Sequence, residues 1–229
     1  MSHPVIHASL HVLVAMVCAT IAWCDGYCDS LRGEAAVVRS VRSVSSLHAL
    51  SRSVSDALVP VSLALPVGLF AAGHLHDAQY DAASGVVLLA AEAATLGTTY
   101  LLKQTVRRPR PWRAHPDCIS PGANDDEFSF PSGHSSMATT MATYLSLRYP
   151  VWYVVTPTVL FAGYTWYARM NLGVHYPSDV IVGALLGAAI GYGAYRLTET
   201  VRSSIAPVLP LPQSPPDRGF PVVNLRIPL

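Results

Sequence analysis

Six apolar segments, separated by short polar stretches, constrain the fold of this chain more than any other feature of its sequence. Each approaches the length that an α-helix needs to cross a hydrocarbon layer about 30 Å thick. Several are diluted with Thr, Gly and Ser, a composition typical of helices that pack against one another in a membrane. The sequence therefore predicts an all-α helical bundle, an integral membrane protein with about five to six transmembrane helices. The segments are residues 5–23, 57–73, 84–102, 135–147, 151–167 and 180–195.

Composition agrees with lipid as part of the surroundings. Hydrophobic residues make up 51% of the chain and charged residues only 13%, whereas a soluble domain carries roughly a quarter charged residues. The formal net charge is +1, which argues against a nucleic acid as partner. The shorter apolar segments also fit buried helices of a soluble all-α protein, and this alternative stays open.

The chain divides into four parts. Residues 1–23 form a first transmembrane helix or a signal segment; an uncleaved helix is favoured because no Lys or Arg precedes its apolar core and no cleavage site follows it. Residues 24–56 are expected to form an exported amphipathic connection. Residues 57–200 form the main transmembrane domain, and residues 201–229 a proline-rich, extended tail.

Four cysteines are present, and three of them, Cys24, Cys28 and Cys118, belong to segments that are expected to be exported. In an oxidising compartment a disulfide among these three is possible, but the sequence leaves its pairing open. The cysteine spacings match no standard zinc site.

Polar chemistry concentrates in three blocks, of which the first is 103-KQTVRRPRP-111. It places Lys103, Arg107, Arg108 and Arg110 directly after an apolar segment. By itself, such a block is also typical of the basic end of a membrane helix.

The second block is 129-SFPSGHSSMATT-140. Ser132 is a good N-cap for a helix from about Gly133 through Tyr144. The N-terminus of a helix attracts anions, and Gly133 lets a ligand approach the backbone closely. His134 stands in the first turn beside this anion site, although a plain helix cap explains the block equally well when it is taken alone.

The third block is 169-RMNLGVHYPSD-179. Pro177 and Asp179 both suit the first turn of a helix that continues through the last apolar segment. Asp179, four residues after His175, is close enough to orient the imidazole, as a nucleophilic histidine requires. Arg169 offers a planar fork to phosphate-like oxygens. With alternate membrane crossings, all three blocks meet at one membrane face, which favours a single assembled site.

These blocks resemble the type 2 phosphatidic acid phosphatase superfamily, whose helical core is also found in vanadium-dependent haloperoxidases and class A acid phosphatases. The family pattern is matched in order by Lys103 with Arg110-Pro111, by 131-PSGH-134, and by Arg169, His175 and Asp179. One position departs from the pattern, because Ala168 replaces the serine before the last arginine.

The resemblance implies a phosphatase that hydrolyses a lipid phosphate or diphosphate, with His175 as nucleophile, Asp179 as its orienting group and His134 as proton donor and acceptor. The phosphate oxygens would be held by Lys103, Arg110, Ser132, Gly133 and Arg169. No metal or other cofactor is expected. Expected substrates are a polyprenyl diphosphate, phosphatidylglycerol phosphate, phosphatidic acid or lipid A.

The expected location is the bacterial inner membrane, with the active site facing the periplasm, while the oligomeric state is left open. A soluble periplasmic acid phosphatase, a vanadium haloperoxidase and a non-catalytic anion-binding membrane protein are the alternatives. The loop from Trp112 to Phe130 would shape the entrance or form a solvated loop; its acidic residues are Asp117, Asp125, Asp126 and Glu127.

Overall fold

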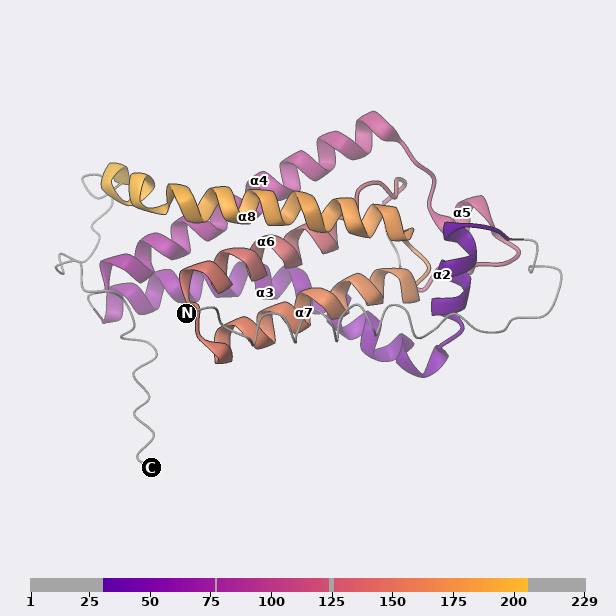
Figure 1. Ribbon diagram of the computed structural model, residues 1–229, viewed down its shortest axis with the longest axis horizontal. Helices are drawn as coiled ribbons and strands as arrows, with labels where there is room; N and C mark the ends of the chain where they lie inside the picture. Colours follow the sequence, from indigo (N-terminus) through magenta and orange to yellow (C-terminus); the bar gives the residue numbers. More distant parts are fainter. Residues whose placement is uncertain (1–30, 77, 124–125, 206–229) are drawn as a thin grey trace, which may run out of the picture.

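The fold is a bundle of long helices with short helices at one end (Figure 1). The computed structural model describes residues 31–76, 78–123 and 126–205, and within them it contains no β-strand. The prediction of an all-α fold is confirmed. The helices are α2 (Glu34–Arg42), the 3-10 helix η2 (Ser45–Leu47), α3 (His48–Leu75), α4 (Gln79–Val106), α5 (Pro111–Ala114), α6 (Gly133–Arg148), α7 (Trp152–Asn171) and α8 (Pro177–Ile205).

Five of the six apolar segments form helices, each longer than its apolar stretch. α3 begins at His48, well before the predicted start at Ala57. α8 continues through Ile205, so that residues 201–205, which the sequence assigned to the extended tail, are helical. The predicted first helix, Cys24, Cys28 and the rest of the tail lie outside the described residues.

Three of the described helices, α3, α4 and α8, are long and apolar enough to cross a membrane. Large apolar side chains on their outer surfaces remain exposed, among them Leu63, Leu101 and Leu185. A surface of this kind suits contact with lipid chains. The protein is a membrane protein, whereas membrane crossing by the shorter α6 and α7 stays a prediction.

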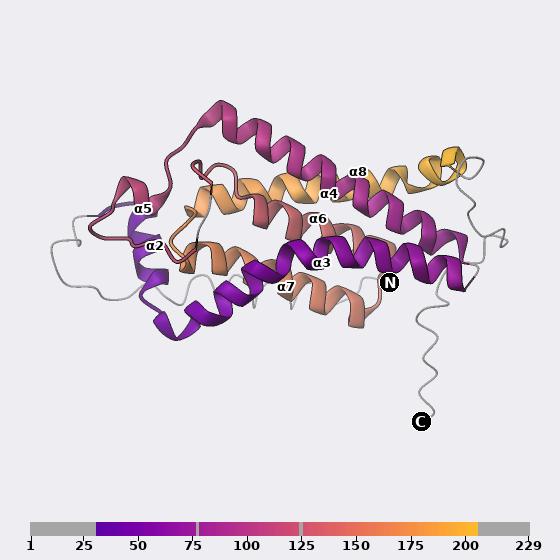
Figure 2. The ribbon, with the colours of Figure 1, turned by 180° about the vertical axis from the view of Figure 1, so that it is seen from behind.

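α6 and α8 run parallel, and α7, which connects them in the chain, runs antiparallel to both (Figure 1). α3 and α4 form an antiparallel pair on the other side of the bundle (Figure 2). The starts of α6 and α8 therefore lie at the same end as the last turns of α4 and α7. This end also carries α2 and α5 (Figure 1).

A stripe of glycines on α8 allows α6 and α8 to lie in direct backbone contact. A Cβ atom added to Gly183 would come within 2.6 Å of the Ser132 carbonyl oxygen. At Gly187 the same distance, to the Ser136 carbonyl oxygen, is 2.1 Å, and at Gly191 it is 2.7 Å to that of Thr140. Small residues four apart are the usual means of close helix packing in membranes, and here they fix the relative height of the two helix starts.

The short helix α2 packs across the loops at this end of the bundle. Its buried residues Ala35 and Val38 form a cluster with Ile119 and Tyr176. At its C-terminal end, the Asn171 side-chain amide donates a hydrogen bond of 2.9 Å to the Val41 carbonyl. The predicted amphipathic connection thus contains a helix whose apolar face covers part of the bundle.

Substitution of Gly187 by alanine is expected to lower the free energy of unfolding by about 2 kcal/mol, because the new methyl group overlaps the Ser136 carbonyl. Reversible unfolding in mixed detergent micelles measures this change. The matched control is Gly193→Ala on the same helix, where a Cβ atom meets nothing within 4 Å. Equal stability of the two variants would contradict close α6–α8 packing at Gly187.

Candidate active site

Lys103 occupies the last turn of α4 and points into the end of the bundle. α4 ends because Arg107 adopts a left-handed conformation with φ of 52°, a common way to terminate a helix. Pro109 then prevents α4 from continuing, and Pro111 begins the short helix α5. The Lys103 side chain is buried, and its Nζ donates to the Phe128 carbonyl at 2.5 Å.

The chain after α4 runs beside the segment that precedes α6. The Ser129 amide donates to the Arg108 carbonyl at 2.8 Å, and Pro109 forms a β-bridge with Phe128. The Arg110 guanidinium is almost fully buried, with an exposed fraction of 1%. Its Nη1 donates to the Val174 carbonyl at 2.8 Å, which links the first polar block to the third.

The second polar block is joined directly to the start of α8. Ser132 is the N-cap of α6, and its side chain accepts from the Ser135 amide, so the predicted cap is confirmed. The Ser132 amide donates to the Asp179 carbonyl at 3.0 Å. Because α6 and α8 are parallel, both helix N-termini face the same region, and each favours a bound anion there.

The third block reverses the chain between α7 and α8. Gly173, with φ of 71°, lies in the left-handed region that glycine adopts easily. This turn leaves Arg169 on the last turn of α7, where its Nη1 donates to the Ser55 hydroxyl of α3 at 2.5 Å. It also brings His175 to the start of α8, with an exposed fraction of 1%.

The two ring nitrogens of His175 face different partners. Nε2 lies 3.1 Å from Nη1 of Arg110. A guanidinium only donates hydrogen bonds, so Nε2 carries the lone pair and the proton of the neutral ring is on Nδ1. Nδ1 lies 3.6 Å from Oδ2 of Asp179, which is longer than a hydrogen bond but close enough to attract a positive ring. The sequence predicted this pair, and Arg110 is the group that determines the tautomer.

The surroundings of His175 keep its imidazole neutral. Burial, together with the positive charges of Arg110, Arg169 and Lys103 and the neighbouring His134, lowers the pKa of His175 well below its ordinary value. A neutral imidazole can act as a nucleophile through the lone pair of Nε2, which here faces the Arg110 guanidinium. Asp179 stands on the opposite side of the ring, where it stabilises positive charge that develops when Nε2 forms a bond.

A carboxylate from the acidic loop bridges two of the cations of this site. Oδ1 of Asp126 accepts from Nζ of Lys103 at 3.2 Å and also from the Arg110 guanidinium. Burial raises the pKa of Asp126, but Lys103 and Arg110 outweigh it, so the pKa lies below its ordinary value. Asp126 is therefore ionised at neutral pH, and its carboxylate stands between Lys103 and Arg110, two cations that are predicted to hold phosphate oxygens.

The described structure thus gathers the residues that the sequence assigned to a single site: Lys103, Arg110, Ser132, Gly133, His134, Arg169, His175 and Asp179 all lie at one end of the bundle. Among the described residues, no three His, Cys, Asp or Glu side chains form a group that fits a metal ion.

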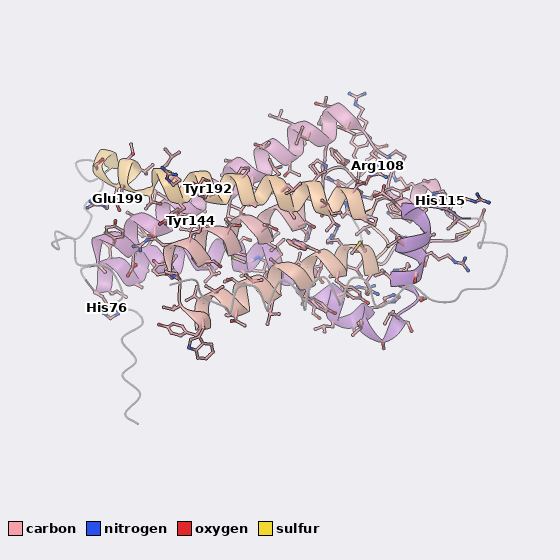
Figure 3. All side chains as sticks on the ribbon, in the orientation of Figure 1. His76, Arg108, His115, Tyr144, Tyr192 and Glu199 are labelled. Atoms are coloured by element: carbon pink, nitrogen blue, oxygen red, sulfur yellow. The ribbon has the colours of Figure 1, made fainter. Side chains whose placement is uncertain are left out.

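Two side chains at this end were not selected as site residues from the sequence. Arg108 donates from Nη1 to Oδ1 of Asp179 at 2.8 Å and from Nη2 to Oε2 of Glu34 at 2.7 Å. Figure 3 shows Arg108 near the start of α8, with His76 and Glu199 at the opposite end of the bundle. Nothing in the sequence distinguishes Arg108 from the other basic residues of the first polar block, and no sequence signal marks Glu34.

Comparison with known proteins agrees with this arrangement. The model of the PAP2 superfamily matches residues 84–203, more than half of the chain and every polar block of the site. The chain belongs to the PAP2 superfamily. The resemblance to type 2 phosphatidic acid phosphatases is therefore confirmed, while the roles of the individual site residues stay predictions.

Two curated bacterial relatives illustrate the range of this PAP2 protein's family. The chain is similar to the decaprenylphosphoryl-5-phosphoribose phosphatase of Mycobacterium tuberculosis, with 40% identity over 40% of this chain and 48% of the relative. The chain thus spans about half the length of this relative. It is also similar to the undecaprenyl-diphosphatase BcrC of Bacillus subtilis, with 30% identity over 56% of this chain and 68% of the relative.

Two crystal structures share the fold. LpxE of Aquifex aeolicus matches with a TM-score of 0.61 and 25% identity, over 73% of this chain and 97% of that one. A phosphatidylglycerolphosphate phosphatase of the PAP2 type from Bacillus subtilis matches with a TM-score of 0.58 and 20% identity, over 85% of this chain and 96% of that one. The second likeness concerns the fold alone.

Substitution of Asp126 by asparagine is expected to tighten the binding of inorganic phosphate by about threefold to fivefold. The variant loses a competing negative charge whose partly exposed ion pairs are worth up to about 1 kcal/mol. Because the pKa of Asp126 is lowered, the carboxylate stays ionised as the pH falls through the mildly acidic range, so the competition persists there. Titration calorimetry of the purified protein with phosphate measures the effect.

Glu127→Gln is the matched control, since Glu127 pairs with Arg113 and not with the buried cations. Unchanged or weaker phosphate binding by the Asp126 variant would contradict competition between Asp126 and phosphate.

Proposed function

We propose that this protein is a metal-independent phosphatase that hydrolyses a phosphate or diphosphate group on a membrane lipid through a phosphohistidine at His175. The observation that carries this proposal is the neutral, buried imidazole of His175, whose Nε2 faces Arg110 and whose Nδ1 faces Asp179. A nucleophile beside a guanidinium is suited to attack on a phosphoryl group that the guanidinium holds.

In the first step, Nε2 of His175 attacks phosphorus in line with the bond to the lipid oxygen. The new P–N bond forms as the P–O bond breaks, and His134 donates a proton to the departing oxygen. The ring becomes positively charged, and the Asp179 carboxylate stabilises it. Lys103, Arg110 and Arg169 hold the equatorial oxygens, with help from Ser132 and the Gly133 amide at the start of α6. Their positive charge supplies the stabilisation for which other phosphatases use a divalent ion.

In the second step, a water molecule attacks the phosphohistidine and transfers a proton to His134. The P–N bond breaks, inorganic phosphate forms, and His175 returns to its neutral state. The products are phosphate and a lipid alcohol or, from a diphosphate, phosphate and a lipid monophosphate.

A lipid substrate is supported by the location of the site and by the relatives. The site lies at one end of a bundle whose long helices expose apolar side chains, where a lipid headgroup at the membrane surface would reach it. The curated relatives named above are a decaprenylphosphoryl-5-phosphoribose phosphatase and an undecaprenyl-diphosphatase. Polyprenyl diphosphate, phosphatidylglycerol phosphate, phosphatidic acid and lipid A are the substrates to compare.

Wild-type protein in chelator is expected to release phosphate from at least one member of this lipid panel, and His175→Ala to lose turnover by about 10³-fold or more. Colorimetric phosphate release measures turnover, and brief incubation with ³²P-labelled lipid followed by alkaline denaturation traps the acid-labile phosphohistidine. His115→Ala, in the loop outside the site, is the control. Turnover or labelling retained by His175→Ala would refute the nucleophile.

We further propose that the active end faces the periplasm and that the protein resides in the bacterial inner membrane. Support comes from Cys118, which lies at this end and is disulfide-bonded, a state typical of oxidising compartments.

A cysteine at Arg113, near the active end, is expected to react with a membrane-impermeant maleimide in intact cells. The matched control is a cysteine at Glu199 at the other end of the bundle, which should react only after the cells are opened. Both positions are exposed. The opposite labelling pattern would place the active end in the cytoplasm.

A further inference from the structure

Arg108 binds two carboxylates, that of Asp179 near the start of α8 and that of Glu34 at the start of α2. Its Nη1 donates to Oδ1 of Asp179 at 2.8 Å and to the Ser178 hydroxyl at 2.6 Å. Its Nη2 donates to Oε2 of Glu34 at 2.7 Å. The guanidinium also lies over the ring of Tyr176, 4.0 Å from its centroid. Contacts with four neighbours hold this planar group in one orientation.

Glu34 extends the same network to the start of α8. Its Oε1 accepts from the Ser178 amide at 2.7 Å, and its Oε2 accepts from the Ser178 hydroxyl at 3.0 Å. Burial raises the pKa of Glu34, but hydrogen bonds from Arg108 and Ser178 outweigh it, so the pKa is lower than its ordinary value. Glu34 is therefore ionised at neutral pH, as a partner of Arg108 and of a helix N-terminus must be.

Asp179 divides its two carboxylate oxygens between this network and His175. Oδ1 faces Arg108, whereas Oδ2 accepts from the Tyr176 amide at 2.8 Å and faces Nδ1 of His175. The Asp179 side chain has an exposed fraction of 0%, and a buried carboxylate requires hydrogen bonds and a counter-charge. Arg108 therefore holds Oδ1 while the Tyr176 amide holds Oδ2, and these two contacts together orient the carboxylate beside His175.

We infer that Arg108 and Glu34 are positioning residues for the Asp179–His175 pair, and that α2 thereby forms part of the catalytic machinery. The inference rests on the proposed function, since it assigns a role relative to His175 as nucleophile. Glu34 lies outside residues 84–203, the part of the chain that matches the family model. Glu34 is the first residue of α2, and Ala35 and Val38 of this helix pack against Ile119 and Tyr176. This packing fixes the position of Glu34.

The test compares Arg108→Gln, Arg108→Lys and Glu34→Gln in the phosphate-release assay. Arg108→Gln is expected to lower kcat by about 10- to 100-fold, the usual range for a residue that orients a reacting group, with KM changed by less than about threefold. The inhibition constant of inorganic phosphate should also stay near the wild-type value, because Lys103, Arg110 and Arg169 remain. Arg108→Lys should recover part of kcat, since an ammonium group reaches one of the two carboxylates.

Glu34→Gln is expected to lower kcat less, by about threefold to tenfold, because Arg108 keeps its bond to Asp179 but loses its second anchor. In the double variant, Glu34→Gln should cause no further loss beyond that of Arg108→Gln, since Glu34 acts through Arg108. Arg107→Gln is the matched control: Arg107 is exposed and its Nε bonds to the Gln104 carbonyl of its own helix, so kcat should be unchanged.

Three outcomes would overturn the inference. Wild-type kcat in Arg108→Gln would remove Arg108 from the reaction. A raised KM and weaker phosphate inhibition with kcat unchanged would make Arg108 a phosphate-binding residue. Additive losses in the double variant would show that Glu34 does not act through Arg108.

A readout without turnover separates this inference from the proposed function. In protein labelled with ¹⁵N-histidine, the His175 ring signals, assigned by their loss in His175→Ala, report its tautomer. Arg108→Gln and Glu34→Gln should alter the Nδ1–H signal, whereas Arg107→Gln should not. If wild-type protein released no phosphate from any lipid, the proposed function would fail, and unaltered ring signals in Arg108→Gln would independently refute the positioning role.

Discussion

The close approach of α8 to α6 is the contact on which the site depends. Gly183, Gly187 and Gly191 let the backbones of two parallel helices touch, so the start of α6 lies beside the first turns of α8. The Ser132 amide then reaches the Asp179 carbonyl, and the second and third polar blocks become one surface. A side chain larger than hydrogen in this stripe would push the two helices apart and with them His134 and His175, although neither histidine would have changed.

Charge balance determines how the buried cations are kept in place. Lys103 and Arg110 share the Asp126 carboxylate, and Arg108 is neutralised by Asp179 and Glu34. These two groups of ion pairs lie on different sides of His175. The pair formed by Asp126 is partly exposed, with 57% of the Asp126 side chain accessible, and it involves the two cations that we propose to bind phosphate. The pair formed by Asp179 is buried and has hydrogen bonds on both oxygens, which suits a group that stays fixed during a reaction.

Much of this organisation could be predicted from the sequence, because the signals are local. Five apolar segments mark the long helices, and Ser132 marks the start of α6. Arg108 and Glu34 escaped prediction for a physical reason. A run of basic residues after an apolar helix is normally solvated, and only the folded chain brings Arg108 to Ser178 and Asp179 at the start of α8. Acidic residues in a loop are also normally solvated, yet Asp126 contacts the buried side chains of Lys103 and Arg110.

The sequence by itself determined the family, the all-α class and the residues of the three blocks, since their types and spacings are fixed along the chain. Tertiary structure alone decided that Arg110 sets the tautomer of His175, that Asp126 lies between Lys103 and Arg110, and that Glu34 pairs with Arg108. The contacting residues are 65 positions apart for Arg110 and His175, 16 for Arg110 and Asp126, and 74 for Glu34 and Arg108. Such distances are bridged only when α6 and α8 pack through their glycines and α2 folds over the end of the bundle, and no local pattern encodes them.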